Sequence, residues 1–212
     1  RMPAVVSIPM GTSNAVNITD GLDGLAIMPM IICSTILGAI SYFTGNVNMS
    51  EHLKLFYIPG SGEMSVFLAT ICGSGLGFLW YNFYPAQIFM GDTGALLLGL
   101  VCSILAIKFI ELQREVLNTP YTFKSAPSVA IAILILPLFD TLRVFVLRIM
   151  EGKSPFNPDR KHIHHIMIDL GLSHMQATGV LFLTNVLFII LAITLQDVGN
   201  LLLLSIIISL AL

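Results

Sequence analysis

Charged residues are scarce in this chain. Asp, Glu, Lys and Arg make up 10% of its 212 residues, whereas hydrophobic residues make up 56% and the mean hydropathy is +0.89. Soluble domains carry about 25% charged residues. A soluble core of this size does not hide so much apolar surface, so the composition excludes an ordinary soluble domain and indicates a membrane protein with several spans.

Basic residues and cysteines are also few, and each shortage excludes a kind of site. Ten Lys and Arg against twelve Asp and Glu leave a net charge of −2, without a basic strip studded with aromatics, so no nucleic-acid partner is expected. The three cysteines, Cys33, Cys72 and Cys102, lie inside apolar runs without Cys-x-x-Cys spacing. They are interpreted as small hydrophobes that form neither a disulfide nor a metal site.

The apolar runs predict an all-α transmembrane bundle. A spanning helix needs about 20 mostly apolar residues. Five complete spans are predicted, at residues 25–44, 64–81, 95–112, 128–150 and 176–195. Partial spans at 2–12 and 201–212 reach the two ends of the chain. We therefore expect a single membrane domain, 1–212, that is a fragment of a larger enzyme and lacks its N-terminal part.

Alternation of the spans divides the connecting segments between two sides of the membrane. One side has residues 13–24, 82–94 and 151–175. Its basic cluster is the densest, between Arg143 and Lys161, so this side is expected to be cytoplasmic. The segments on the opposite side contain turn residues, and no chemistry is assigned to them.

Acidic and amide side chains recur in the first two cytoplasmic segments. Asn17, Asp20 and Asp23 are spaced three apart, so a helix there would place them on one face. Carboxylates at the mouth of an apolar segment are costly unless they bind a cation or a polar ligand. Asp92 stands between two glycines before a span, where helix capping and binding of a phosphate or metal ion are both open.

The third cytoplasmic segment concentrates basic residues and histidines. It contains the run Arg160-Lys161-His162-Ile163-His164-His165. Such a cluster is able to bind zinc, but the adjacent cations favour an anion such as a diphosphate, and contact with anionic lipid is a third interpretation. Asp140 and Arg143 lie one turn apart in the preceding span, either as functional residues or as an internal pair.

Together the three segments predict surface chemistry. Carboxylates suit Mg²⁺, and arginine and histidine suit phosphates, so we expect a Mg²⁺-assisted reaction of a nucleotide diphosphate at the membrane surface. A transporter or channel is an alternative, but its sites are expected near mid-membrane on broken helices.

These motifs resemble the polyprenyl-phosphate N-acetylhexosamine-1-phosphate transferase superfamily (glycosyltransferase family 4). Over about 11–99, the runs NAVNITDGLDGLAIMP at 14–29, GFLWYN at 77–82 and YPAQ at 84–87 look like its phospho-N-acetylmuramoyl-pentapeptide transferases, and FMGDTG at 89–94 resembles the superfamily's Mg²⁺ motif. From about 136 onward, PFNPDRKHIHH at 155–165 is similar to its undecaprenyl-phosphate GlcNAc-1-phosphate transferases. The chain is accordingly a hybrid or a divergent member.

The resemblance implies a role for each matching residue. Catalytic roles fall to Asp20, Asp23 and Asp92, with Asp92 as the Mg²⁺ ligand. Substrate-binding roles fall to Asn17, Asn82, Phe89, Arg160, His162, His164 and His165. Asn82 and Phe89 would help to hold the uridine, and Arg160 and the histidines would engage the sugar or the diphosphate.

The implied reaction transfers a phospho-N-acetylhexosamine from a UDP-sugar to undecaprenyl phosphate and releases UMP, in bacterial cell-envelope glycan synthesis. UDP-GlcNAc is favoured as the donor because the last cytoplasmic segment is expected to meet the sugar. The alternative donor is UDP-MurNAc-pentapeptide, which would yield the first lipid intermediate of peptidoglycan.

The resemblance also implies a multi-pass protein of the bacterial inner membrane, with membrane lipid around it and homodimer formation left open. The parent enzyme would have roughly ten to eleven helices. The superfamily carries an Asp-Asp motif on an earlier cytoplasmic loop, and no Asp-Asp pair occurs here. The 212-residue chain alone is therefore expected to be inactive, and an inactive fragment or membrane scaffold is a further alternative.

Overall fold

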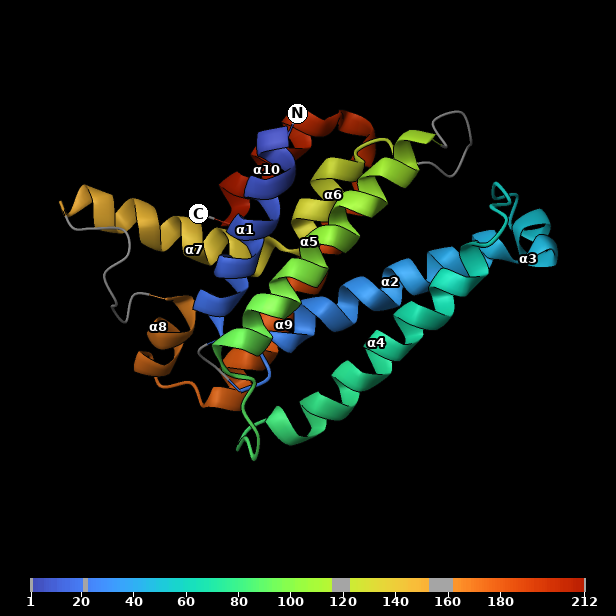
Figure 1. Ribbon diagram of the computed structural model, residues 1–212. Helices are drawn as coiled ribbons and strands as arrows, with labels where there is room; N and C mark the ends of the chain where they lie inside the picture. Colours follow the sequence, from blue (N-terminus) through green and yellow to red (C-terminus); the bar gives the residue numbers. More distant parts are fainter. Residues whose placement is uncertain (1, 21–22, 116–122, 153–161, 212) are drawn as a thin grey trace.

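Every regular element in the described residues is helical (Figure 1). The computed structural model describes residues 2–20, 23–115, 123–152 and 162–211. The helices are α1 (Met2–Thr19), α2 (Ile27–Gly45), α3 (Val47–His52), α4 (Ser61–Asn82), α5 (Gly91–Glu115), α6 (Ala126–Ile133), α7 (Ile135–Met150), α8 (Ile163–Asp169), α9 (His174–Thr194), the 3₁₀ turn η1 (Gln196–Val198) and α10 (Asn200–Ala211).

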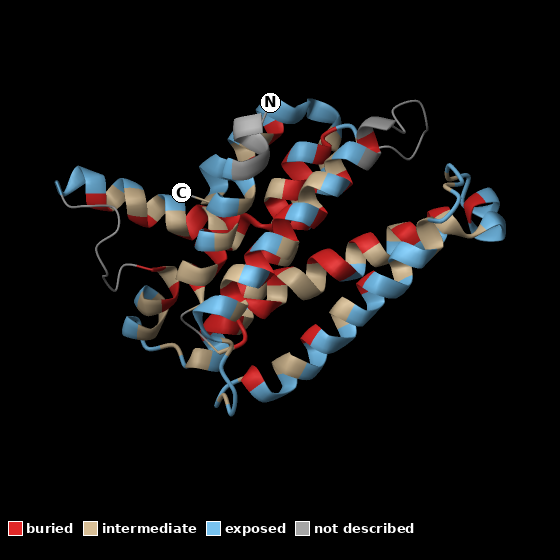
Figure 2. Cartoon of the chain, in the orientation of Figure 1, coloured by how far each residue is buried: buried red, intermediate tan, exposed pale blue. Residues whose placement is uncertain are grey.

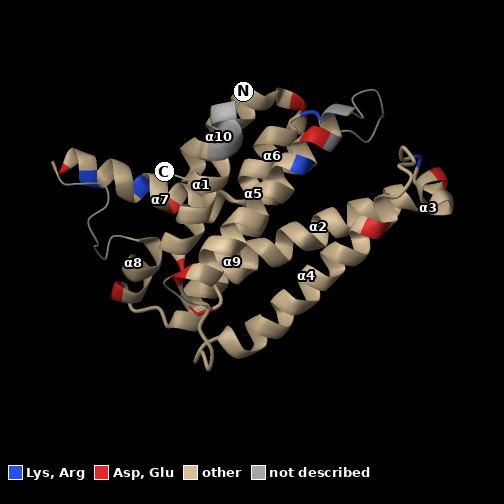
Figure 3. Ribbon diagram, viewed as in Figure 1, with Lys and Arg blue, Asp and Glu red and all other residues tan. Residues whose placement is uncertain are grey.

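Four of these helices, α2, α4, α5 and α9, are long and apolar enough to cross a membrane. The bent pair of α6 and α7 makes a fifth span if it is counted as one. The interiors of α2 and α9 carry no charged residue, and Figure 3 shows the charged residues of the described chain mostly near helix ends. The predicted all-α transmembrane architecture is confirmed.

The span expected at 128–150 is instead two helices that meet at an angle of 78°. The reason is local. Pro137 has no N–H to donate to the carbonyl of Ile133, four residues earlier, so the helical ladder breaks there. Asn185 of α9, which is fully buried, donates from Nδ2 to this Ile133 carbonyl at 3.1 Å. A partner from another helix thus satisfies the carbonyl that the proline leaves unpaired.

The helices differ in how much of their surface is buried. α1 packs on α5 and α7, and α6 packs on α9. α4 packs along α2, and its outer face is mostly exposed (Figure 2). An exposed apolar helix face is what contact with lipid tails or with a further helix requires.

The α1–α5 contact brings two backbones close together at Gly99. A Cβ atom built on Gly99 would lie 2.5 Å from Ser13 Cα and 2.8 Å from the Thr12 carbonyl oxygen. Nearby, Ser13 Oγ donates to the Leu96 carbonyl at 2.6 Å. Small residues that allow close helix approach are typical of membrane bundles. This contact fixes the position of α1, whose end leads into the segment that carries Asp20 and Asp23, called the acidic segment below.

Candidate active site

The cytoplasmic segments predicted from the sequence converge at one end of the bundle. Figure 1 shows the end of α1, the end of α4, the start of α5, helix α8 and the start of α9 gathered there. At the other end, Ser125 Oγ donates to the Gln196 carbonyl at 2.7 Å, and Lys124 pairs with Asp197 at 2.7 Å. The segments with the predicted site residues therefore lie at one end of the bundle, and the connection between α9 and α10 lies at the other.

The expectation that Asn17, Asp20 and Asp23 share a helix face is wrong. Helix α1 ends at Thr19, so only Asn17 is helical, while Asp20 follows the helix and Asp23 lies in a turn. Gly24, with φ of +81°, takes the left-handed conformation in this turn. Asp20 and Asp23 come close enough for their charges to interact, although no helix continues through them.

Asp23 connects three elements. Its Oδ2 accepts a hydrogen bond from the Ala86 N–H, in the connection between α4 and α5, at 3.0 Å. Its carbonyl oxygen accepts from Thr178 Oγ1 of α9 at 3.3 Å. Asp23 therefore links the turn after α1 to the connection before α5 and to α9.

Asn82 links the same two connections. Its Oδ1 accepts from the Gly24 N–H at 2.9 Å, and its Nδ2 donates to the Ile88 carbonyl at 2.9 Å. The side chain is buried. Both polar groups of this carboxamide thus contact backbone, whereas the nearby Phe89 ring is 76% exposed and accessible to a ligand.

Asp20 and Asp92 are placed differently from Asp23. Within the described residues neither carboxylate accepts a hydrogen bond, and Asp92 lies exposed in the first turn of α5. Burial, and next the negative charges of Asp92 and Asp23, raise the pKa of Asp20 above its ordinary value. The site therefore holds close negative charges that a cation would neutralise.

The residues here fit a Mg²⁺ ion that is shared with a substrate. The described part of the chain contains no group of three His, Cys, Asp or Glu side chains placed to enclose a metal ion. Mg²⁺ is, however, commonly held by one or two carboxylates, water and substrate phosphates. Asp20 and Asp92 supply such carboxylates, and the buried Asn17 Oδ1 lacks a partner in the described residues and offers a further oxygen.

Asp140, which is not among the predicted site residues, anchors the histidine segment that begins at His162. His162 Nδ1 lies 2.7 Å from Asp140 Oδ2, and the Ile163 N–H donates to Asp140 Oδ1 at 3.0 Å. The rings of His162 and His164 stack with centroids 5.7 Å apart. The signal for Asp140 was present in the sequence, as an acid within a span, but its partner lies 22 residues further on.

His164 sits at the centre of this cluster. Its ring is 4.2 Å, centroid to centroid, from the ring of His165, and it lines a small cavity with Thr19, Leu25 and Asp140. The histidine cluster therefore lies next to the end of α1, where Asp20 follows Thr19. Burial, and next the neighbouring His165, lower the pKa of His164 to about 4, so its imidazole is neutral at pH 7. Arg160, the remaining predicted residue, lies outside the described residues.

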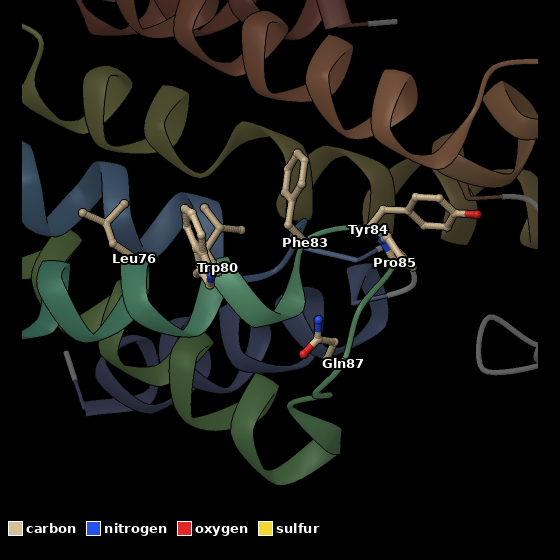
Figure 4. Close-up of a pocket in the computed structure, with 7 residues that line it drawn as sticks. Leu76, Trp80, Phe83, Tyr84, Pro85 and Gln87 are labelled. Carbon is tan, nitrogen blue, oxygen red and sulfur yellow. The ribbon is translucent and has the colours of Figure 1, made fainter.

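An apolar groove of about 560 Å³ lies beside the site (Figure 4). It is lined by Leu76, Leu79, Trp80, Phe83, Tyr84, Pro85 and Gln87. Figure 4 shows Leu76 and Trp80 on α4, and the other labelled residues in the connection that follows it. The Tyr84 ring stacks on His174 of α9, with centroids 5.0 Å apart.

Comparison with known proteins identifies a family and many relatives, among them the following two. Residues 1–110 match the family model described as Glycosyl transferase family 4. The chain is 74% identical over 98 residues to the phospho-N-acetylmuramoyl-pentapeptide-transferase of Fusobacterium nucleatum subsp. nucleatum, covering 46% of this chain and 27% of that protein. It is 51% identical over 106 residues to the protein of the same name from Ruegeria pomeroyi, covering 50% of this chain and 29% of that protein. The chain thus spans less than a third of these relatives.

Proposed function

Because this chain belongs to glycosyl transferase family 4, we propose that it forms part of the active site of a membrane phospho-sugar transferase. The proposed reaction moves a phospho-N-acetylhexosamine from a UDP-sugar to undecaprenyl phosphate and releases UMP. One observation carries the proposal: Asp20, directly after α1, and Asp92, in the first turn of α5, lie close enough for their charges to interact, and Thr19 beside Asp20 lines a cavity with His164. The proposed location is the bacterial inner membrane, with this site facing the cytoplasm.

Mg²⁺ is the proposed cofactor, held by Asp92 together with Asp20. When bound, it would neutralise charge on the diphosphate that reacts. Asn17 Oδ1 would contact the ion or its water. Asp23 would keep the connection between α4 and α5 in place through its bond to Ala86. Phosphoryl transfer depends mainly on positioning and charge neutralisation, which this set of residues supplies.

The nucleotide and the sugar are assigned to different parts of the site. The exposed ring of Phe89 is proposed to stack on the uracil, and Asn82 to hold the connection that presents Phe89. His162, His164 and His165, with Arg160, are proposed to engage the sugar or the diphosphate. The neutral His164 suits contact with the sugar better than with a phosphate.

UDP-MurNAc-pentapeptide is the donor that the comparisons favour. Both named relatives are pentapeptide transferases, and the stronger identity of 74% spans almost half of this chain. UDP-GlcNAc, which the sequence analysis preferred, is the second candidate, because the run at 155–165 has the pattern of the GlcNAc-1-phosphate transferases.

A UMP-release assay with each donor tests the function. The chain would be purified alone and, separately, joined to the upstream part that its relatives contain, then supplied with undecaprenyl phosphate and Mg²⁺ in detergent. We expect the joined protein to release UMP with UDP-MurNAc-pentapeptide, and Asp92→Asn to abolish this activity while Asp169→Asn, at an exposed position of α8, retains it. Release with UDP-GlcNAc alone would select the second candidate, and release with neither donor would contradict the proposal.

A further inference from the structure

We propose that Asp140 is a positioning residue that fixes the tautomer of His162 and thereby makes the His162 Nε2 atom a hydrogen-bond acceptor for the donor sugar. The sugar-binding half of this inference rests on the proposed function. The half that concerns the tautomer rests on the geometry of Asp140 and His162 alone.

Both carboxylate oxygens of Asp140 are engaged by the histidine segment. Oδ2 lies 2.7 Å from His162 Nδ1, and Oδ1 accepts from the main-chain N–H of Ile163, the first residue of α8, at 3.0 Å. Asp140 and His162 are 4% and 7% exposed, so water competes little for these bonds. The pair also spans residues 153–161, so it holds the segment after them against α7.

The chemistry of the pair determines where the proton lies. An ionised carboxylate only accepts hydrogen bonds, so the His162 Nδ1 facing it must carry the hydrogen. In the tautomer that carries its hydrogen on Nδ1, Nε2 has no hydrogen and is a hydrogen-bond acceptor. Stacking on His164 fixes the ring plane. An acceptor in this position matches a hydroxyl or amide N–H of an N-acetylhexosamine.

The substitution Asp140→Asn would reverse this arrangement at nearly constant shape. The Ile163 N–H still requires an oxygen, so the asparagine Oδ1 would face Ile163 and its Nδ2 would face His162. An amide NH₂ donates, so His162 Nδ1 would become the acceptor and the proton would move to Nε2. The ring would then present a donor to a sugar group that is itself a donor, and binding would weaken.

The test combines ¹⁵N NMR of the histidine rings with kinetics of the protein joined to its upstream part, in detergent. The His162 signal is assigned by its loss in His162→Gln. We expect the wild-type ring to be protonated at Nδ1 and the Asp140→Asn ring at Nε2. We also expect Asp140→Asn to raise the KM for the UDP-sugar about 30-fold while the KM for undecaprenyl phosphate stays within about twofold. Asp169→Asn is the matched control and should change neither value.

Protonation at Nε2 in the wild type would overturn the inference. Equal rises of both KM values in Asp140→Asn would also overturn it, because they would indicate that Asp140 has only a structural role. If Asp140→Asn fails to fold, the wild-type spectrum still decides the tautomer, and Asp140→Glu, which retains a carboxylate acceptor, should keep the Nδ1-protonated form. A wild-type protein that turns over neither donor contradicts the proposed function and the sugar contact, whereas the tautomer is still judged by the spectrum.

Discussion

At the scale of single residues, Asp20 is the carboxylate whose surroundings most disfavour its charge. Its pKa is raised from 3.8 by burial and by Asp92 and Asp23, so ionisation at neutral pH lowers the stability of the folded state. Asp20→Asn is therefore expected to raise the unfolding temperature at pH 7 by roughly 2–4 °C without Mg²⁺. The gain should vanish as the pH falls toward 3.8, where the unfolded wild-type side chain is also protonated. Thermal unfolding in detergent at several pH values measures this.

The same variant should lose the response to the proposed cofactor. We expect Mg²⁺ to raise the unfolding temperature of the wild type and to have little effect on Asp20→Asn, whose UMP release should fall about 100-fold or more. Asp169→Asn serves as the control because its side chain is exposed and distant in sequence from the acidic segment. A Mg²⁺ response that persists in Asp20→Asn would remove Asp20 from the metal site.

His164 gives the opposite dependence of stability on pH. Its pKa is lowered from 6.5 to about 4, so between these values the unfolded chain binds a proton that the folded chain does not. The stability that the neutral ring contributes is complete above about pH 6.5 and is lost as the pH falls toward 4. At pH 5 the wild type should lose roughly 1–2 kcal/mol relative to pH 7.5 through this residue.

The measurement is the difference in unfolding free energy between pH 7.5 and pH 5, in wild type and in His164→Gln. The variant should show a smaller difference, because glutamine does not titrate. His52→Gln, in the exposed helix α3, should behave as the wild type does. Equal pH dependence in wild type and His164→Gln would show that the ring is protonated in the folded state at pH 5.

At the scale of the elements, the contact between α1 and α5 depends on a missing side chain. Gly99→Ala would place a methyl group 2.5 Å from Ser13 Cα, so the two helices must separate. We expect a loss of about 1–3 kcal/mol and a drop in activity, because α1 leads into the acidic segment. Gly73→Ala in α4 meets no atom within 4 Å and should be neutral or stabilising by up to about 1 kcal/mol. Thermal unfolding of the two variants measures this difference. Similar losses of stability in Gly99→Ala and Gly73→Ala would refute the close approach of α1 and α5.

At the scale of the whole molecule, the two ends of the bundle should lie on opposite sides of a membrane. Single cysteines at Ser173 and at Asn200, in a chain without Cys33, Cys72 and Cys102, test this with a membrane-impermeant thiol reagent. In sealed inverted vesicles, Ser173→Cys should react at once and Asn200→Cys only after the membrane is opened, as the cytoplasmic assignment requires. The reverse pattern would invert the orientation, and equal labelling would place both ends on one side.

The first half of the chain, which matches glycosyl transferase family 4, packs against the second half at the candidate site. Thr178 of α9 contacts Asp23, and Thr141 Oγ1 of α7 lies 3.5 Å from the Ala15 carbonyl of α1. Helix α1 also packs directly on α7. The residues around Asp20 and Asp23 therefore lie in the same region of the fold as the histidine cluster.

The sequence by itself determined the membrane class and the helical architecture, and it predicted which residues would form a site. Hydropathy acts locally: an apolar run of about 20 residues favours a helix in a membrane, because the helix satisfies its backbone groups within the segment. The polar segments at 13–24, 82–94 and 151–175 followed from the same alternation, and with them Asp20, Asp92 and the three histidines. The roles of these residues stay predictions.

Only the tertiary structure decided which of these residues contact one another. The bend at Leu134 combines the local effect of Pro137 with a donor, Asn185, that lies some fifty residues later and satisfies the exposed carbonyl. The contact of Asp140 with His162 and that of Asp23 with Ala86 likewise join distant segments. A hydrogen bond of about 3 Å depends on how helices are placed in space, which hydropathy and spacing along the chain do not encode.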